Sequence, residues 1–388
     1  MFCFKRGYSL FAGAAAMLMT AACGTVQADG PEKAPAEAAP KVKVALFLDE
    51  GCRGNGALHW ARMLARSPQI DLTIIDGKAL RDGKLAGCQL LVCPGGGGAK
   101  QIGAMKPAGF RIVKKFVNDG GAYLGICAGS YNVMNREGRF AFLPYDYIHG
   151  AAGKLADITV ELNERGAELL GVKPGRFVCR YNGGNIMRPT EPTGKGDCEV
   201  LAVFKSSSSF PDRPAYNFID TPAMIYGQYG KGKVLAVSPH PESYESTRPI
   251  AMGMVRALIG VTPTPIRPAK VVRPLRVGFL SLACVGPRAA REMLALDRDP
   301  ELDVEIFSTH EINERGLCHY DVIVMPAGEE KSYLKFKDSE FLRAKVDEFL
   351  AAGGRIVASG NGSKYLPQHE NIKTIKVGTK FAPAVKGK

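Results

Sequence analysis

The sequence has little of what marks several specialised classes of protein. It contains one tryptophan and ten cysteines in 388 residues, and ten cysteines are too few for a scaffold held together by disulfide bonds. Apolar residues make up 46% and charged residues 23%, which excludes collagen-like, coiled-coil and disordered chains. No basic stretch carries interleaved aromatic residues, so no nucleic-acid partner is expected. The 45 glycines indicate many tight turns, as in an α/β protein with functional loops.

The N-terminal segment indicates export. Lys5 and Arg6 precede an apolar run over residues 10–19, which is too short to cross a bilayer as a helix. A basic start followed by a short apolar run is typical of a cleaved signal peptide. Residues 1–22 are therefore predicted to be a signal peptide, and the chain is expected in the periplasm or on the outer membrane of a bacterial cell envelope.

Two processing sites fit this signal peptide. Small residues precede Cys23 and resemble a bacterial lipobox, so a lipid on Cys23 would anchor the chain to the membrane. Ordinary cleavage after Ala28 is the alternative, because residues 26–28 (Val-Gln-Ala) resemble a signal-peptidase site. In either case residues 23–40 are rich in Pro and Ala and are predicted to form a flexible tether.

Positive charge is the one marked excess. Lys and Arg outnumber Asp and Glu by 13, and removal of residues 1–22 takes away two basic residues and no acid. Residues 276–388 are nearly balanced, so the excess lies in the first part of the chain. It fits attraction to an anionic envelope surface or an acidic substrate, and it fits equally a solvated basic face without a partner.

An internal repeat predicts the architecture. Each copy reads as strand, helix, strand, strand, helix, strand, and its short β-branched runs are apolar throughout, as in strands buried on both faces. The sequence therefore predicts a flavodoxin-like, doubly wound parallel sheet with helices on both faces, followed by a second, truncated copy. The matching segments keep a constant offset of 232–233 residues: 43–64 with 276–294, 70–76 with 302–308, 88–96 with 320–328, and 110–126 with 341–359.

The repeat also sets the expected domain boundaries. Residues 41–262 are predicted to form a complete domain. Residues 263–274 hold four prolines and are predicted to be a stiff linker. Residues 275–388 are little more than half as long as the first domain would require, so they are expected to form a degenerate half-domain.

Cys127 is the candidate nucleophile. It is the central residue of Gly-Ile-Cys-Ala-Gly (125–129), which lies between an apolar strand and helix-like residues. This arrangement has the form of a nucleophile elbow with cysteine in place of serine. At a helix N-terminus the helix dipole and the free N–H groups favour a thiolate. The motif alone is more typical of a buried structural cysteine, so its meaning depends on what precedes and follows it.

A glycine-rich loop precedes the elbow. Residues 94–98 (Pro-Gly-Gly-Gly-Gly) follow the apolar strand that comes before that of Cys127. Backbone N–H groups of Gly96 and Gly97, together with that of Ala128, are candidates for binding an oxyanion. A plain crossover loop is the alternative interpretation of the glycines.

A His-x-Glu segment follows the elbow in the sequence. His240 and Glu242 come directly after another apolar strand, and residues at i and i+2 of an extended segment project to the same side. His240 is therefore a candidate base for the cysteine, with Glu242 orienting its imidazole. A surface turn is the alternative for an isolated His-Pro-Glu.

In this order, the glycine-rich loop, the cysteine elbow and the His-x-Glu segment resemble class I glutamine amidotransferases. The closer likeness is to the amidotransferase-like domain at the N-terminus of biotin–protein ligases, and it covers roughly residues 42–260. The resemblance implies that Cys127 is the nucleophile, His240 its base and Glu242 the partner of the base. The motifs that carry it are YLGICAG (123–129), RYNGG (180–184) and SPHPE (238–242).

One position departs from the pattern of that family. Members that hydrolyse glutamine usually read G-x-C-x-G-x-Q, and that glutamine helps to hold the substrate, whereas Tyr131 occupies its place here. Glutamine is therefore in doubt as the substrate, although attack of a cysteine on an amide is not. The resemblance implies a substrate pocket lined by Tyr131, Tyr181, Asn182, Gly183 and Gly184.

The second copy lacks this chemistry. In its register Cys127 corresponds to Gly360, and no His-x-Glu follows. Residues 275–388 are therefore expected to have a structural role or to dock a protein partner.

Neither a cofactor nor a metal ion is expected, because the histidines have no ligand-like spacing. Among the remaining cysteines, Cys179 and Cys198 are the most plausible disulfide pair, and the others are expected to be buried thiols.

The leading hypothesis is an exported cysteine-dependent hydrolase, or amidase, that acts on the C–N bond of a small-molecule or peptide amide through a Cys-His-Glu triad. Two alternatives stay open. The first is a ligand-binding or scaffold protein that retains the fold without catalysis. The second is a glutaminase that depends on a partner.

Overall fold

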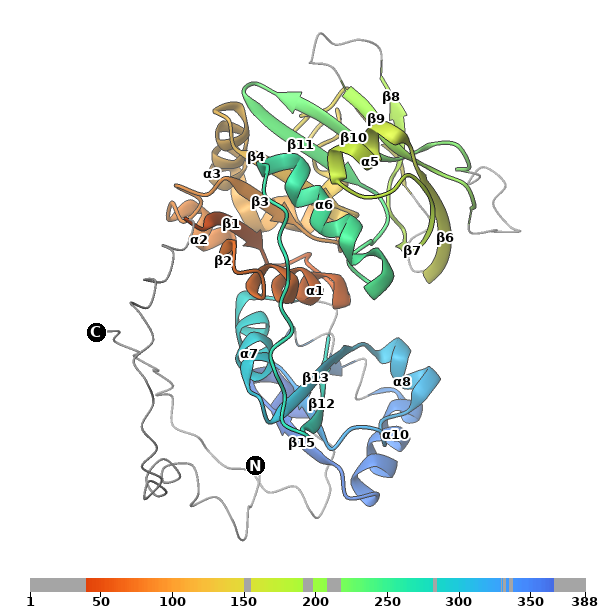
Figure 1. Cartoon of the computed structure of the whole chain (residues 1–388). Helices are drawn as coiled ribbons and strands as arrows, with labels where there is room; N and C mark the ends of the chain where they lie inside the picture. The colour runs from red at the N-terminus through yellow and green to blue at the C-terminus, as the bar shows by residue number, and fades with distance from the viewer. Residues whose placement is uncertain are drawn as a thin grey trace, which may run out of the picture. The chain divides into compact units, whose positions relative to one another are not determined.

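The computed structural model describes residues 40–149, 155–190, 198–207, 218–281, 285–328 and 338–365, with residues 330, 333 and 334 (Figure 1). The predicted signal peptide, Cys23, the tether up to residue 39 and the end of the second copy (366–388) lie outside the described residues. Residues Pro40–Tyr365 group into one compact unit. Within the described ranges, no helix combines the length and apolar character that a membrane crossing requires.

The first copy is built on a nine-stranded sheet with the strand order β2-β1-β3-β4-β11-β10-β9-β6-β7. Its first five strands pair in parallel, in the order of a flavodoxin-like sheet, which confirms the predicted class. The nine strands are β1 (Val42–Phe47), β2 (Ile70–Ile75), β3 (Leu90–Cys93), β4 (Ala122–Ile126), β6 (Leu155–Leu162), β7 (Gly175–Asn182), β9 (Cys198–Phe204), β10 (Pro222–Tyr229) and β11 (Gly232–Val237).

Helices cover both faces of the parallel part. Every residue of β3 and β4 is buried, which is the pattern of strands packed on two sides. Helices α1 (Gly54–Ala65) and α6 (Arg248–Ile259) lie on one face (Figure 1). The other face carries α2 (Gly77–Arg81) and α3 (Gly98–Asn118).

Beyond β11 the sheet continues with antiparallel strands, which the sequence did not predict. β10 and β11 form a hairpin whose two-residue loop begins at Gly230, with a φ of +57°. A loop of this length joins only antiparallel neighbours, because parallel strands need a long crossover. The antiparallel part continues with β9, β6 and β7, and α5 (Glu164–Leu170) lies between β6 and β7 in the chain. A small separate sheet pairs β5 (Tyr145–Ile148) with β8 (Ile186–Pro189).

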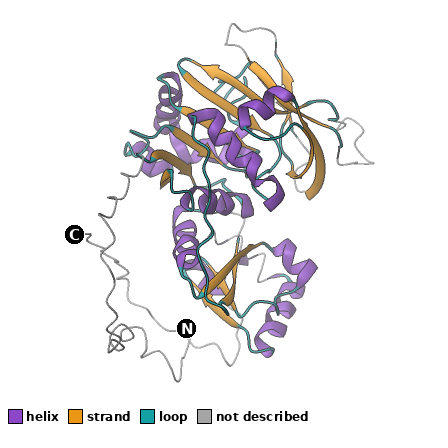
Figure 2. Ribbon diagram, viewed as in Figure 1, coloured by secondary structure: helices purple, strands orange, loops and turns teal. Residues whose placement is uncertain are grey.

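The second copy repeats the first half of this design (Figure 2). Its parallel sheet has the order β13-β12-β14-β15, which matches β2-β1-β3-β4, and each strand starts 232–233 residues after its counterpart. The predicted repeat is therefore confirmed. Its elements are β12 (Leu275–Leu280), α7 (Pro287–Arg298), β13 (Leu302–Phe307), α8 (Thr309–Arg315), β14 (Val322–Met325), α10 (Glu340–Ala351), β15 (Arg355–Ala358) and the 3₁₀ helix η3 (Gly360–Tyr365).

Helix α1 makes the main polar contacts between the two copies. The guanidinium of Arg66 donates to both carboxylate oxygens of Asp297, at 2.7 and 2.8 Å, and Arg62 donates to the carbonyl oxygen of Val304 at 2.9 Å. The side-chain amide of Asn55 donates to Glu311 at 2.9 Å. Because the Asp297 side chain is only 3% exposed, its ion pairs are shielded from solvent.

The expected disulfide between Cys179 and Cys198 is wrong. No disulfide joins Cys179 to Cys198 in the described part of the chain. Cys179 lies on β7 and Cys198 on β9, and β6 runs between these two strands. Strands two places apart are separated by about 10 Å, which is beyond the reach of a disulfide bond.

Candidate active site

Three segments meet at one edge of the parallel sheet. β4 ends directly before Cys127, β3 ends directly before the glycine-rich loop, and β11 ends directly before Ser238 and His240-Pro-Glu. The three strands are neighbours in the order β3-β4-β11. Because parallel neighbours end at the same edge, the predicted nucleophile, oxyanion loop and base come together there.

Cys127 lies in a strained turn between β4 and the short helix α4 (Ala128–Tyr131). Its φ of +49° and ψ of −101° are unusual for a residue with a side chain. Its N–H donates to the carbonyl oxygen of Val237 at 2.7 Å, and its own carbonyl accepts from the N–H groups of Ser130 and Tyr131. These bonds hold the cysteine in the conformation of a nucleophile elbow, with its side chain 4% exposed.

His240 and Glu242 are held side by side next to this turn. Nδ1 of His240 lies 2.9 Å from Oε1 of Glu242, and both side chains are buried. The N–H of His240 donates to the carbonyl oxygen of Arg180 on β7 at 2.8 Å, which fixes the backbone that carries the imidazole. The glycine-rich loop fits between base and thiol, because a Cβ on Gly95 would lie 2.5 Å from Cε1 of His240 and 3.5 Å from the Cβ of Cys127.

The surroundings of His240 favour its protonated form. Burial by itself lowers the pKa of His240, but the charge of Glu242, and then the charge and hydrogen bond of Cys127, outweigh burial and raise that pKa to about 10. An imidazolium beside a cysteine is the arrangement that cysteine hydrolases use to keep their nucleophile as a thiolate.

Helix α1 leaves room for Glu242 at Gly56. A Cβ on Gly56 would lie 2.3 Å from Oε1 of Glu242, which is closer than real atoms approach. Oε2 of Glu242 is buried and has no hydrogen-bond partner among the described residues. Gly56 is therefore a positioning residue that sequence reasoning missed.

One of the three predicted oxyanion donors is already hydrogen-bonded within the chain. The N–H of Gly97 donates to the carbonyl oxygen of Gly51 at 2.8 Å, because the glycine-rich loop pairs antiparallel with the segment after β1. In this pairing Gly96 lies opposite Cys52, at a position whose N–H points away from the partner segment. Ala128 is the first residue of α4, so its N–H has no partner within the helix. Gly96 and Ala128 remain as the candidate donors.

Tyr131, Asn182 and Gly183 lie around the thiol, where substrate-binding residues were expected. Sγ of Cys127 is 3.8 Å from the carbonyl oxygen of Asn182, and the hydroxyl of Tyr131 donates to the carbonyl oxygen of Gly183 at 3.0 Å. The ring of Tyr131 packs edge-on against Tyr147, with ring centres 4.6 Å apart. Tyr131 therefore occupies the position of the family's glutamine, and its ring is held by the hydrogen bond to Gly183 and by packing on Tyr147.

Two residues expected in the pocket have structural roles instead. Tyr181 is fully buried, stacks on Phe218 with ring centres 5.1 Å apart, and donates its hydroxyl to the carbonyl oxygen of Gly184 at 2.7 Å. It precedes Asn182 on β7, so the two side chains point to opposite faces of the sheet. Gly184 packs on Ser238, whose carbonyl oxygen would be 2.2 Å from a Cβ at that position.

A buried polar cluster behind the elbow was not predicted. The hydroxyl of Ser130 lies 2.7 Å from the carbonyl oxygen of Cys127 and 2.6 Å from the side-chain oxygen of Asn185. The amide of Asn132 donates to Gln101 at 3.0 Å, and Gln101 donates to the carbonyl oxygen of Pro94 at 2.8 Å. These bonds connect the glycine-rich loop to the helix after Cys127.

Among the described residues, no group of three or more His, Cys, Asp or Glu side chains is placed to hold a metal ion.

The parallel sheet and the cysteine elbow with its His-x-Glu segment define an amidotransferase-like α/β protein. The family model for the N-terminal part of biotin–protein ligase matches residues 44–141 and 135–252, which together make up more than half of the chain. The chain therefore belongs to this family, as its motifs predicted. Both matched segments lie in the first copy, and neither reaches the second.

The chain is also similar to individual known proteins. Biotin–protein ligase of Schizosaccharomyces pombe is 27% identical over 192 residues, which are 42% of this chain and 27% of the ligase. The match thus spans about a quarter of the ligase. An uncharacterized protein of Chlamydia muridarum is 31% identical over 219 residues, or 52% of this chain and 80% of that protein. Among solved structures, PurLQS from Thermotoga maritima aligns with 56% of this chain and 98% of its own, at 15% identity and a TM-score of 0.41.

Glu242→Gln is expected to lower the pKa of His240, because the variant loses the carboxylate that raises this pKa while burial, which lowers it, remains. His240 should then be neutral at a pH where it is protonated in the unchanged chain. The folded-state pKa lies above the ordinary 6.5, so protonated His240 stabilises the fold below pH 6.5, and this contribution is lost as the pH rises through about 10. NMR titration of labelled histidines measures the shift. His319→Gln serves as the control, and an unchanged His240 titration in Glu242→Gln would contradict the assigned cause.

Gly56→Ala is expected to push the Glu242 carboxylate away from His240, because the added methyl group cannot fit beside Oε1. The rate at which iodoacetamide alkylates Cys127 near neutral pH should fall by about tenfold or more, as for other residues that orient a catalytic group. Gly103→Ala, at an open position of α3, is the matched control and should leave the rate unchanged. An unaltered rate in Gly56→Ala would show that Gly56 has no positioning role.

Proposed function

We propose that this protein is a cysteine-dependent hydrolase that cleaves the C–N bond of an amide. The observation that carries the proposal is that Cys127, held in a strained elbow, and the buried His240–Glu242 pair lie on either side of Gly95. A strained backbone at a buried nucleophile is costly to maintain and is typical of functional sites.

Each of the grouped residues has a part in the proposed reaction. The Cys127 thiolate attacks the carbonyl carbon, and the N–H groups of Gly96 and Ala128 stabilise the oxyanion that forms. Protonated His240 gives its proton to the leaving amine, the C–N bond breaks and a thioester remains. Neutral His240 then takes a proton from water, which attacks the thioester, releases the acid and regenerates Cys127. Glu242 keeps the imidazole oriented throughout.

The place of Tyr131 supports an amide other than glutamine as the substrate. Its anchored ring stands where glutamine-hydrolysing members of the superfamily place a glutamine, and its hydroxyl is already bonded to Gly183. A small-molecule or peptide amide is the substrate class that we propose.

The 4% exposure of Cys127 favours a second candidate function. A thiol that is closed off in the unliganded chain fits a ligand-binding protein that has kept the fold without catalysis. A partner that opens the site would make the chain a partner-dependent glutaminase.

Formation of an acyl-enzyme distinguishes these functions. The purified chain, incubated with a panel of amides and activated esters and quenched in acid, is expected to show an acyl adduct on Cys127 by intact-mass and peptide mass spectrometry. Cys127→Ala should abolish the adduct and lower turnover by about three orders of magnitude or more. Cys88→Ala, which removes a partly exposed free thiol, should keep both.

The absence of any adduct across the panel, in a folded chain, would reject the hydrolase and favour the binding protein. An adduct that forms with glutamine only after a cell extract is added would favour the partner-dependent glutaminase.

Export is proposed from residues 1–22 and Cys23, which lie outside the described residues. Mass spectrometry of the chain from a bacterial membrane fraction is expected to find a lipid on Cys23 that is lost in Cys23→Ala. A chain cleaved after Ala28 would instead show simple secretion, and an intact N-terminus in the cytosol would reject export.

A further inference from the structure

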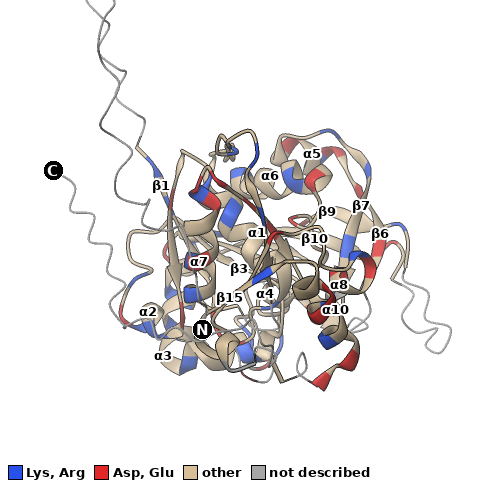
Figure 3. Cartoon of the chain, turned by 90° about the horizontal axis from the view of Figure 1, so that it is seen from below, with Lys and Arg blue, Asp and Glu red and all other residues tan. Residues whose placement is uncertain are grey.

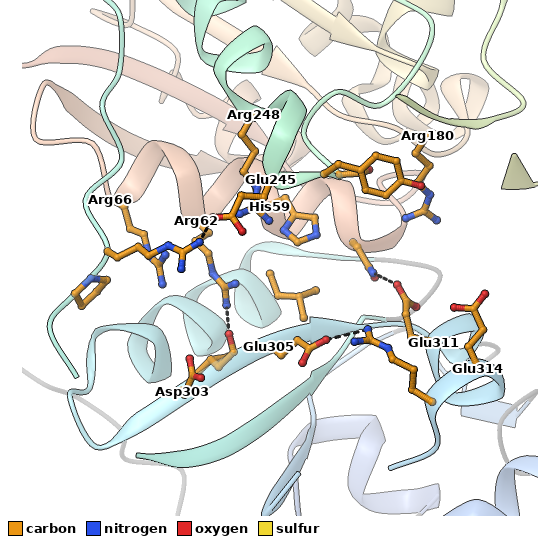
Figure 4. Close-up of a pocket in the computed structure, with 18 of the residues that line it drawn as sticks. His59, Arg62, Arg66, Arg180, Glu245, Arg248, Asp303, Glu305, Glu311 and Glu314 are labelled. Atoms are coloured by element: carbon orange, nitrogen blue, oxygen red, sulfur yellow. Dashed lines mark hydrogen bonds and ion pairs between the residues drawn. The ribbon is translucent and has the colours of Figure 1, made fainter. Parts of the chain in front are cut away.

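A cavity of about 1030 Å³ lies apart from the proposed active site. Cys127, His240 and Glu242 do not line it. Its walls come from α1, β7, the 3₁₀ helix η2 (Glu245–Thr247) and the start of α6 in the first copy, and from β13 and α8 in the second (Figure 4). Its volume is in the range of sites for small organic ligands.

Basic side chains of the first copy gather on one wall of this cavity. Arg62 and Arg66 on α1 are already neutralised, since both pair with the buried carboxylate of Asp297, at 3.2 and 2.7 Å. Arg180 on β7 and Arg248 at the start of α6 complete the wall.

Arg180 and Arg248 have no such acceptor. Nε of each is buried and makes no hydrogen bond to any described residue, and neither guanidinium has an ion pair within the described ranges. Nδ1 of His59 on α1 is likewise buried without a partner. In Figure 4 these three side chains reach from the first copy toward the cavity. Buried donors in folded proteins are normally paired, so these three atoms suit an acceptor from outside the chain.

The acids of the cavity do not supply that acceptor. Glu305 pairs with Arg315 at 3.0 Å, Glu311 accepts from Asn55 at 2.9 Å, and Asp157 accepts from the hydroxyl of Tyr244. Glu245 pairs with Arg267. The charge on Asp303 acts on Arg62. Asp157 lies opposite Arg180 on the neighbouring strand, but the two form no ion pair.

The positive field of the arginines is strong enough to act on His59. Burial lowers the pKa of His59 first, and the charges of Arg248, Arg62 and Arg180 lower it further, to about 3. His59 is therefore neutral near neutral pH, and it can offer one N–H to an anion without adding charge.

We propose that this cavity binds a small molecule through an oxyanion group, a phosphate or a carboxylate, held by Arg180 and Arg248 with His59 beside them. The planar guanidinium groups present paired N–H donors that match the spacing of oxygens in both groups. The site is separate from the Cys127 centre and does not depend on whether that centre is catalytic.

Isothermal titration calorimetry of the full chain with inorganic phosphate, and separately with succinate and citrate, tests the proposal. One saturable site is expected for phosphate or for a carboxylate, and the arm that binds more tightly identifies the group. Arg180→Gln and Arg248→Gln should each weaken binding by about tenfold or more. Arg267→Gln is the matched control, because Arg267 lines the same cavity but is exposed and already paired.

A second measurement guards against variants that fail to fold. Binding should shift the NMR signal of His59 in the unchanged chain, and Arg248→Lys, which keeps the charge but loses the paired donors, should bind less tightly than the unchanged chain and more tightly than Arg248→Gln. Three results would overturn the proposal. They are no saturable binding of any of the three anions, equal binding in the folded Arg180→Gln/Arg248→Gln double variant, and binding without a change at His59.

Discussion

The parallel pairing of β4 with β11 is the constraint on which the site depends. Ile126 and Val237 lie opposite each other at the ends of these strands, and the N–H of Cys127 extends the ladder by a bond of 2.7 Å to the carbonyl oxygen of Val237. This register fixes where both chain segments leave the sheet, so it also fixes the distance between Cys127 and His240. A shift by one residue would turn the side chains of one strand to the other face and separate Cys127 from His240.

Sequence patterns were sufficient to predict the features that depend on residues close together in the chain. Uninterrupted apolar runs gave the buried parallel strands, the constant offset gave the second copy, and the residues after three strands gave Cys127, His240 and Glu242. Alternation along β7 would also have excluded Tyr181 from the pocket, since adjacent strand residues point to opposite faces. The site details that the sequence did not predict correctly depend on contacts between segments that are far apart in the chain. The amide of Gly97 is taken by Gly51, and Gly56 matters only because Glu242 comes to rest against it.

Basic and acidic residues are distributed unequally between the two copies. The basic excess lies in the first part of the chain, whereas α8 and α10 of the second copy carry several acids (Figure 3). Asp297 lies between Arg62 and Arg66, and its burial makes this one carboxylate the main compensation for two guanidinium groups. The second copy therefore neutralises part of the first, while Nε of Arg180 and Nε of Arg248 keep no hydrogen-bond partner among the described residues.

The described strands of the second copy match only part of the site in the first copy. The proposed nucleophile of the first copy follows β4, but the proposed base follows β11, a strand that is reached only through the antiparallel part of the sheet. The repeated segment corresponds to β1 through β4 alone, and no His-x-Glu occurs in the sequence after β15. A cysteine in place of Gly360 would still have no base beside it. Among the described residues, the second copy therefore repeats the strand before the proposed nucleophile but not the strand before the proposed base.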